Sequence, residues 1–226
     1  MNRRIAEFVR SQTVVAGTQL VPEVRLHLAA QPFEIFQAAE DVGLDRPFWA
    51  FAWPGGQAIA RWLLDHPEEV AGTRVLDIGA GSAITAIAAR LAGAAHVTAN
   101  DTDPTAGVAA GLNAALNGVT VAVETEDALA RPIACDVIVL GEVFYEPEMA
   151  VRITSFLEGA ARRGVKLLFA DRPGVRRPPV PMQLLATMPA QLTPGLDLVG
   201  MSGARVWRLQ ATTRIRARSM KPEAMA

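Results

Sequence analysis

From residue 74 to residue 171, the sequence alternates between short apolar segments and longer segments with helical periodicity. Each apolar segment is nearly continuous, as expected of a strand that is buried on both faces of a sheet. The helical segments between them carry the chain back across the sheet, so that successive strands run parallel. The expected strands are TRVLDIG (73–79), HVTAND (96–101), TVAVE (120–124), DVIVLG (136–141) and VKLLFAD (165–171).

The segment that follows these strands completes the predicted sheet. We expect a helix near residues 181–188, a strand near 196–199 and a last strand, ARVWRLQ, at 204–210. The predicted fold class is therefore α/β: a Rossmann-like, seven-stranded, mainly parallel sheet with helices on both faces and an N-terminal helical extension.

The two ends of the chain differ in composition from the central α/β part. Residues 1–46 are predicted to form the helical extension, because the apolar residues near its start recur at helical spacing. Residues 47–210 are predicted to form a single domain around the sheet. Residues 211–226 are polar and are expected to be a disordered tail.

Charge and cysteine content narrow the class of protein. The formal net charge is −1, whereas nucleic-acid-binding proteins usually carry a basic excess, so we expect no nucleic-acid partner. The single cysteine excludes an internal disulfide, and the three scattered histidines predict no metal site. The N-terminus lacks the apolar core of a signal peptide, and no apolar run is long enough to span a membrane. We therefore expect a cytoplasmic protein without a membrane partner.

A glycine-containing loop follows the first expected strand and leads into a helix. It carries Asp77, Gly79 and Gly81, and its glycines allow a sharp turn and a close approach to a ligand. Residue 84 is Ile, where a dinucleotide-binding GxGxxG motif would place its third glycine. A carboxylate before the glycines suits a cationic ligand better than a pyrophosphate. S-adenosylmethionine, with its ammonium and sulfonium groups, meets that requirement.

Further carboxylates follow the next two strands, at the edge of the sheet where such folds bind ligands. Asp101 is placed to accept both hydroxyl hydrogens of a ribose, as the equivalent acid does in dinucleotide folds. Glu124 and Asp127 could reach an adenine amino group. Asp103, directly before Pro104, is explained by helix capping alone. Together these acids predict a site for a nucleoside cofactor.

Three segments resemble the class I, seven-β-strand S-adenosylmethionine-dependent methyltransferases: VLDIGAGSA, HVTAND and DVIVLGEVFY. The third glycine that is usual in the loop of that family is Ala83 in this chain. The resemblance implies S-adenosylmethionine as the cofactor and S-adenosylhomocysteine as the product.

A narrower resemblance covers most of residues 1–210. PFWAFAWPGGQAIARWLLDHP, NDTDP, LGEVFYE and DRPGVRRP together resemble the electron-transfer flavoprotein β-subunit lysine methyltransferase family. The W-P-G-G segment and the E-x-x-Y motif are its most specific parts. The resemblance implies a protein-lysine N-methyltransferase whose protein substrate is the electron-transfer flavoprotein β-subunit.

Glu142 and Tyr145, at the end of the fourth strand, are the candidate catalytic residues. A carboxylate attracts an ammonium at close range, so Glu142 is expected to bind and align a substrate amine before the amine loses its proton. Desolvation between the aromatic residues would instead favour the uncharged amine, and the sequence leaves open which effect is larger. Tyr145 would orient the amine or shape its channel. The final proton acceptor is left open, with water as one candidate.

The aromatic segment FWAFAWPGG (48–56) precedes the first strand, where it can fold over the cofactor. Trp53 is predicted to form a wall beside the methionine end of the cofactor, where an aromatic face favours a sulfonium. Phe48 and Phe51 are expected in the core, and Trp49 is expected to face the substrate channel.

Two other functions stay open from the sequence. A small-molecule N-methyltransferase, acting on a nicotinamide-like or amine substrate, would enclose its ligand between Glu142 and the aromatic residues. A non-catalytic binding module would have kept the fold alone, although Gly79, Gly81, Asp101 and Glu142 are all present. The sequence does not identify the target lysine, the methylation state or the oligomeric state.

Overall fold

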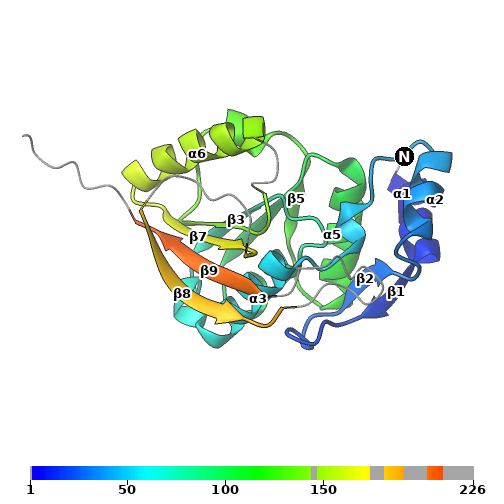
Figure 1. Cartoon of the computed structure of the whole chain (residues 1–226), viewed down its shortest axis with the longest axis horizontal. Helices are drawn as coiled ribbons and strands as arrows, with labels where there is room; N and C mark the ends of the chain where they lie inside the picture. The colour runs from blue at the N-terminus through cyan, green and yellow to red at the C-terminus, as the bar shows by residue number, and fades with distance from the viewer. Residues whose placement is uncertain (1, 144–146, 174–180, 191–202, 211–226) are drawn as a thin grey trace, which may run out of the picture.

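The computed structural model describes residues 2–143, 147–173, 181–190 and 203–210 (Figure 1). The expected strand near 196–199 and the expected tail at 211–226 lie outside the described residues. None of the helices in the described part is long and apolar enough to cross a bilayer. The elements are, in order, α1 (Asn2–Gln12), β1 (Thr13–Ala16), β2 (Leu26–Ala29), α2 (Glu34–Asp41), η1 (Phe48–Ala50), α3 (Pro54–Asp65), η2 (Pro67–Glu69), β3 (Arg74–Ile78), α4 (Ile84–Leu91), β4 (His96–Asn100), α5 (Pro104–Leu116), β5 (Ala122–Glu124), η3 (Ala128–Ala130), β6 (Val137–Leu140), α6 (Pro147–Arg162), β7 (Lys166–Asp171), β8 (Met182–Met188) and β9 (Ala204–Leu209).

A seven-stranded sheet forms the centre of the molecule, in the order β5-β4-β3-β6-β7-β9-β8. The strands from β5 to β7 are parallel, and β9 and β8 complete the sheet in antiparallel orientation. This arrangement confirms the predicted fold class. Because Ile78 pairs with both Asn100 and Leu140, the carboxyl ends of β3, β4 and β6 meet at one edge of the sheet.

Helices cover both faces of this sheet, and the side chains of β7 show how the two faces are divided. Leu168 and Ala170 belong to a buried cluster with α3, α4 and α5, whereas Leu167 and Phe169 belong to a cluster with α6. Successive side chains of a strand point to opposite faces, so the alternation places α6 opposite the other three helices. In Figure 1, α6 lies above the sheet and α3 lies below it.

The strand β8 replaces the helix that the sequence predicted near residues 181–188. The segment MQLLATM has apolar residues at spacings that a helix could also use, and short apolar segments do not separate the two periodicities. In the structure it pairs antiparallel with β9, with an irregularity between Leu184 and Ala186. Pairing with β8 satisfies the backbone groups of β9 that would otherwise form the edge of the sheet.

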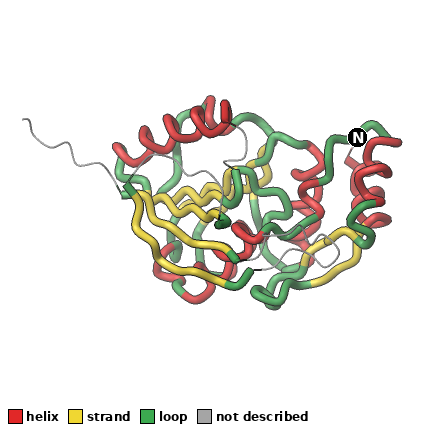
Figure 2. Tube along the Cα trace, in the orientation of Figure 1, coloured by secondary structure: helices red, strands yellow, loops and turns green. Residues whose placement is uncertain are grey.

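The sequence predicted a helical N-terminal extension. In the structure this part also contains the antiparallel pair of β1 and β2 (Figure 2). These strands have four residues each, too few to show a clear periodicity in the sequence. All four residues of β2 are buried, and β2 lies against α5. Tertiary packing on α5 therefore decides this local structure. The predicted boundary at residue 46 stays a prediction.

The buried side chain of Asn113, on α5, joins this N-terminal part to the glycine loop. Its amide oxygen accepts a hydrogen bond from the backbone N–H of His27 at 2.8 Å. Its amide nitrogen donates to the carbonyl of Ser82 at 2.9 Å. The amide therefore satisfies two buried backbone groups that belong to distant parts of the chain.

We expect Asn113→Leu to lower the free energy of unfolding by about 2–4 kcal/mol, because it leaves two buried backbone groups without partners. Asn117, one turn further along the helix, is the matched control. Its amide bonds both backbone groups of Arg25 near the surface, where water can replace it. Asn117→Leu should therefore cost about 1 kcal/mol. Urea unfolding measures both losses, and equal losses would contradict the bridging role of Asn113.

Candidate active site

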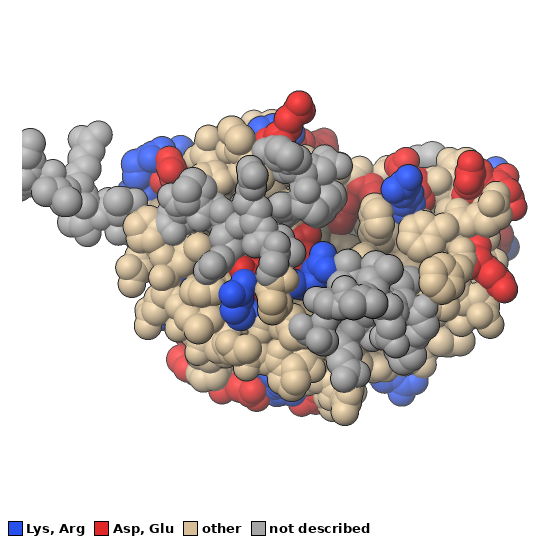
Figure 3. Space-filling model, viewed as in Figure 1, with Lys and Arg blue, Asp and Glu red and all other residues tan. Residues whose placement is uncertain are grey.

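A cavity of about 770 Å³ opens at the carboxyl ends of β3, β4 and β6. This volume is within the range of small-molecule and cofactor sites. Its lining includes the glycine loop, the end of β4, the aromatic segment and the end of β6. Figure 3 shows that acidic and basic side chains are mixed over the described residues of the visible face, as the near-zero net charge suggests.

The glycine loop between β3 and α4 has three left-handed residues, at alternate positions. Gly79 has a φ of 68°, Gly81 of 50° and Ala83 of 60°. A Cβ atom on Gly79 would lie 2.7 Å from Cγ1 of Val143, so this position also requires glycine for space. Ala83 thus adopts a left-handed backbone conformation that favours glycine, which costs about 1–3 kcal/mol for another residue.

Asp77, at the end of β3, is buried, with 2% of its surface exposed. Its carboxylate accepts a hydrogen bond at 3.1 Å from the backbone N–H of Ala86, in the first turn of α4. Burial raises the pKa of Asp77 to about 8, against the opposing effect of the Ala86 N–H. The carboxyl group is therefore largely protonated at neutral pH, and an adjacent ligand cation would ionise it.

Asp101 follows β4 and holds the glycine loop in place. One carboxylate oxygen accepts from the N–H of Gly81 at 2.8 Å, and the other accepts from the N–H of Asp103 at 3.1 Å. Burial raises the pKa of Asp101, while these two N–H groups oppose the rise. Asp103 accepts from the N–H of Thr105 at 2.7 Å, which confirms its predicted role as a helix cap.

The structure separates the two acids that were predicted to reach an adenine. Asp127 lines the cavity; it accepts from the N–H of Leu129 at 2.9 Å and pairs with Arg152. Glu124 is not among the lining residues, because its carboxylate turns outward to an ion pair with Arg131. The structure therefore brings only Asp127 of the two to the site.

Asn100 is a site residue that the sequence reasoning missed. Its buried side chain donates to the carbonyls of Glu124 at 3.1 Å and Glu126 at 2.7 Å, and it lines the cavity. It therefore fixes the loop that carries Asp127. Its position directly before Asp101, at a strand end, was the signal that could have identified it.

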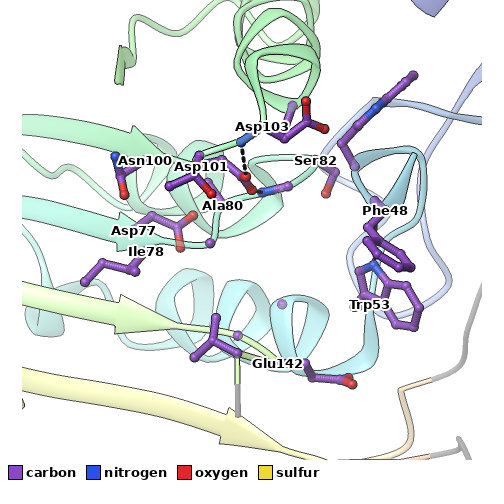
Figure 4. Close-up of a pocket in the computed structure, with 18 of the residues that line it drawn as sticks. Phe48, Trp53, Asp77, Ile78, Ala80, Ser82, Asn100, Asp101, Asp103 and Glu142 are labelled. Carbon is purple, nitrogen blue, oxygen red and sulfur yellow. Dashed lines mark hydrogen bonds between the residues drawn. The ribbon is translucent and has the colours of Figure 1, made fainter. Parts of the chain in front are cut away.

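The aromatic segment forms one end of the cavity (Figure 4). Trp53 lines it and donates from its indole nitrogen to the carbonyl of Phe48 at 3.0 Å. Phe51 is buried, as predicted, and its ring contacts those of Phe36 and Trp53.

Two expectations for this segment are wrong. Phe48, expected in the core, is 44% exposed at the edge of the cavity, because its ring packs edge-on against Trp53. Trp49, expected to face the substrate channel, is counted among the lining residues, but its side chain is 1% exposed and belongs to the core cluster with Ile5 and Ala109. The short helix η1 turns the two side chains in these directions.

Glu142, directly after Gly141 at the end of β6, makes two polar contacts inside the protein. One carboxylate oxygen accepts from the N–H of Gly55, in the first turn of α3, at 2.9 Å. The other accepts from Nε of Arg172, after β7, at 2.5 Å. Burial raises the pKa of Glu142, and these contacts oppose the rise. Tyr145, its predicted catalytic partner, lies outside the described residues.

This contact requires glycine at position 55 of the W-P-G-G segment. A Cβ atom on Gly55 would lie 2.8 Å from Cγ of Glu142, and one on Gly141 would lie 3.4 Å from the backbone nitrogen of Gly56. The end of β6 therefore packs directly on the backbone at the start of α3. Arg172 was not predicted as a site residue, although it follows a strand at the same edge.

The chemistry of the lining suits the expected cofactor. Figure 4 shows Asp101 and Asp103 on one side of the cavity and Glu142 on the other. Asp77 adds a further acid near the glycine loop, and this acid-rich lining does not suit a phosphate. A nucleoside with hydroxyl groups and a cationic amino-acid part, as in S-adenosylmethionine, fits these acceptors and the aromatic end.

Comparison with known proteins agrees with this site. Residues 61–144 match the family model of ribosomal protein L11 methyltransferase (PrmA). The electron transfer flavoprotein beta subunit lysine methyltransferase of Xenopus laevis is 39% identical over 168 residues, which cover 73% of this chain and 68% of the relative. The protein of the same description from Rattus norvegicus is 39% identical over 162 residues, covering 70% of this chain and 64% of the relative. The chain thus spans about two thirds of the length of these relatives.

A solved structure supports the fold. Magnesium protoporphyrin IX methyltransferase from Synechocystis PCC 6803, with bound S-adenosylmethionine, has a TM-score of 0.51 and a sequence identity of 16%. The match covers 69% of this chain and 77% of that chain.

The raised pKa of Asp77 predicts a dependence of stability on pH. Because its pKa is about 8 in the folded protein and near 3.8 when unfolded, the folded state holds an extra proton between these values. The ligand-free protein should therefore lose stability relative to Asp77→Asn as the pH rises from 5 to 8, by about 1 kcal/mol per pH unit. Chemical unfolding at a series of pH values measures this difference.

Asp136→Asn is the matched control, because the pKa of this exposed acid is lowered by its hydrogen bond to Arg74. Its contribution is lost only as the pH falls through that lowered pKa, so the difference should stay flat between pH 5 and 8. A flat difference for Asp77→Asn as well would show that Asp77 is ionised in the folded protein.

Proposed function

Because the chain belongs to the electron transfer flavoprotein β-subunit lysine methyltransferase family, we propose that it methylates lysine side chains of an electron transfer flavoprotein β-subunit. The chain is an S-adenosylmethionine-dependent methyltransferase. The observation that carries the proposal is the largely buried carboxylate of Glu142 beside the glycine loop, in a chain that is 39% identical to such a lysine methyltransferase.

When bound, S-adenosylmethionine supplies an electrophilic methyl group. The lysine ε-amine attacks with its lone pair, so the new N–C bond forms as the S–C bond breaks and the sulfur keeps the bonding electrons. The amine must be uncharged, although its free pKa is about 10.4. The methylated amine then carries a positive charge and releases a proton to water before a further transfer.

Glu142 is placed to orient this amine. Its two carboxylate oxygens each accept one described hydrogen bond, from Gly55 and from Arg172, and a carboxylate can accept about four. The remaining capacity is available to an N–H of the substrate. Because its two contacts fix the carboxylate in advance, the orientation costs little when the substrate binds.

The aromatic end of the cavity contributes by excluding water. Phe48 and Trp53 pack edge-on, with ring centroids 6.1 Å apart, and both line the cavity. Exclusion of water strengthens the hydrogen bonds and charge interactions of the groups inside.

The substrate proposal is tested by incubating the purified protein with methyl-labelled S-adenosylmethionine and purified electron transfer flavoprotein. We expect label on lysines of the β-subunit, located by mass spectrometry of its peptides. Free lysine and simple amines serve as the comparison. Absence of label on the β-subunit, with cofactor binding shown by calorimetry, would refute the protein substrate.

A pair of substitutions separates cofactor binding from methyl transfer. Asp101→Ala should weaken S-adenosylmethionine binding on the order of 10–100-fold, because it removes a charged acceptor and loosens the Gly81 loop. Glu142→Gln should leave that affinity within about threefold but slow transfer on the order of 100-fold. Calorimetry measures the first quantity and single-turnover kinetics the second. Full turnover by Glu142→Gln would show that this carboxylate has no catalytic role.

A further inference from the structure

The Glu142 carboxylate and the Arg172 guanidinium form an ion pair inside the candidate active site. Nε of Arg172 lies 2.5 Å from a carboxylate oxygen of Glu142. The Arg172 side chain is 19% exposed and the Glu142 side chain is 10% exposed. Both residues line the cavity. The positive charge therefore belongs to the wall of the site itself and is only weakly screened by water.

A second ion pair behind the first holds Arg172 in place. Asp171 is buried at the end of β7, and its two carboxylate oxygens accept from Nε and a terminal nitrogen of Arg205, each at 2.9 Å. Trp207 adds a hydrogen bond to the same carboxylate at 3.0 Å. Arg205 also donates to the backbone carbonyl of Arg172 at 3.3 Å. The backbone that carries the guanidinium is thus fixed to β9.

The charges that face Glu142 can be assigned by element. Arg172 and the N–H of Gly55, at the positive end of α3, favour its ionised form, whereas Asp171 of β7 opposes it. The charge of Asp171 is balanced by Arg205 of β9. Further charged groups in the described lining are the acids Asp45, Asp77, Asp101, Asp103 and Asp127 and the base Arg46.

Arg172 changes what the carboxylate can bind. A lone carboxylate in a buried site pairs best with an ammonium ion, and an ammonium has no lone pair with which to attack a methyl group. A carboxylate and a guanidinium that are paired have no net charge together, so the pair does not require a further cation. The carboxylate can still accept a hydrogen bond from an uncharged amine, while the guanidinium disfavours a second cation nearby.

We propose that Arg172 is a positioning residue. Its guanidinium supplies the positive charge that neutralises Glu142, a charge that a lysine ammonium would otherwise supply, so that Glu142 binds the amine in its uncharged, nucleophilic form. This role rests on the proposed function and explains how the same site selects the reactive form of lysine. The proton that the free ammonium carries is released to solvent when the amine enters the site. No other group needs to accept it before the methyl transfer.

The first test needs no protein substrate. The probe is n-butylamine, with S-adenosylhomocysteine present, and its affinity is measured by NMR titration from pH 7 to pH 9. The wild-type affinity should rise about tenfold per pH unit, because one proton leaves for each amine that binds. Arg172→Gln should bind the ammonium form, so its affinity should change less than about threefold over the whole range and exceed the wild-type affinity at pH 7.

Two variants control for charge and for general damage. Arg172→Lys keeps the positive charge and should restore the wild-type slope. Arg152→Gln removes another arginine of the site's surroundings, one that pairs with Asp127 instead of Glu142, and should also keep the slope. Equal slopes for wild type and Arg172→Gln, or no amine binding to either protein, would overturn the proposal.

A calorimetric measurement on the wild type keeps the proposal testable if Arg172→Gln does not fold. Butylammonium binding at pH 8, in two buffers of different ionisation enthalpy, should release about one proton per amine bound. Release of no proton would overturn the proposal without any substitution.

The second test uses the flavoprotein and separates this inference from the proposed function. With Arg172→Gln, kcat for methylation should fall at least about tenfold at pH 7 and rise steadily up to pH 9, because the bound amine stays protonated over this range, while KM does not rise. A loss of kcat that is the same at every pH would indicate a merely structural role and overturn the inference. If the wild type does not methylate the flavoprotein at all, the proposed function fails, and the butylamine slopes still decide the role of Arg172.

Discussion

The contact between the Glu142 carboxylate and the backbone at the start of α3 joins the parts of the site that come from distant segments. Glu142 follows β6, Gly55 lies in the first turn of α3, and Arg172 follows β7. The approach is possible because residue 55 has no side chain, since a Cβ atom there would lie 2.8 Å from Cγ of Glu142. The aromatic segment before Gly55 is thereby held beside the cavity, and the positions of Trp53 and Phe48 depend on the same contact.

The same physical device recurs at two more helices of the site. Asp77 accepts from an N–H in the first turn of α4, and Asp103 accepts from one in the first turn of α5. The first turn of a helix has N–H groups without partners in the helix, and a carboxylate satisfies them and interacts well with the helix dipole. Each acid is therefore fixed before a ligand binds. Structural and functional roles coincide in these residues, because the contacts that stabilise the helices also orient the carboxylates.

Some positions of the site could be predicted from the sequence and others could not. The glycine loop and Asp101 lie at the cavity because strand ends of a parallel sheet share one edge, which the order of the elements already implies. Glu124 also lies at a strand end, but its side chain forms an ion pair with Arg131, and no pattern in the sequence predicts that pairing. Trp49 and Phe48 have the same local composition around them, yet Trp49 is buried in the core and Phe48 is 44% exposed. The sequence predicts a helix where the structure has strand β8, because a short apolar segment fits both periodicities.

The sequence by itself determined the α/β class, the parallel order of the first strands, the glycine loop and the acids that follow the strands, because these depend on periodicity and on turn chemistry along the chain. Only the tertiary structure decided which of those acids face the cavity and what they contact. The pairing of Arg172 with Glu142 and the bridge from Asn113 to His27 and Ser82 join residues 30 to 86 positions apart. Such contacts depend on how helices and strands pack against each other, and local sequence does not encode the resulting distances.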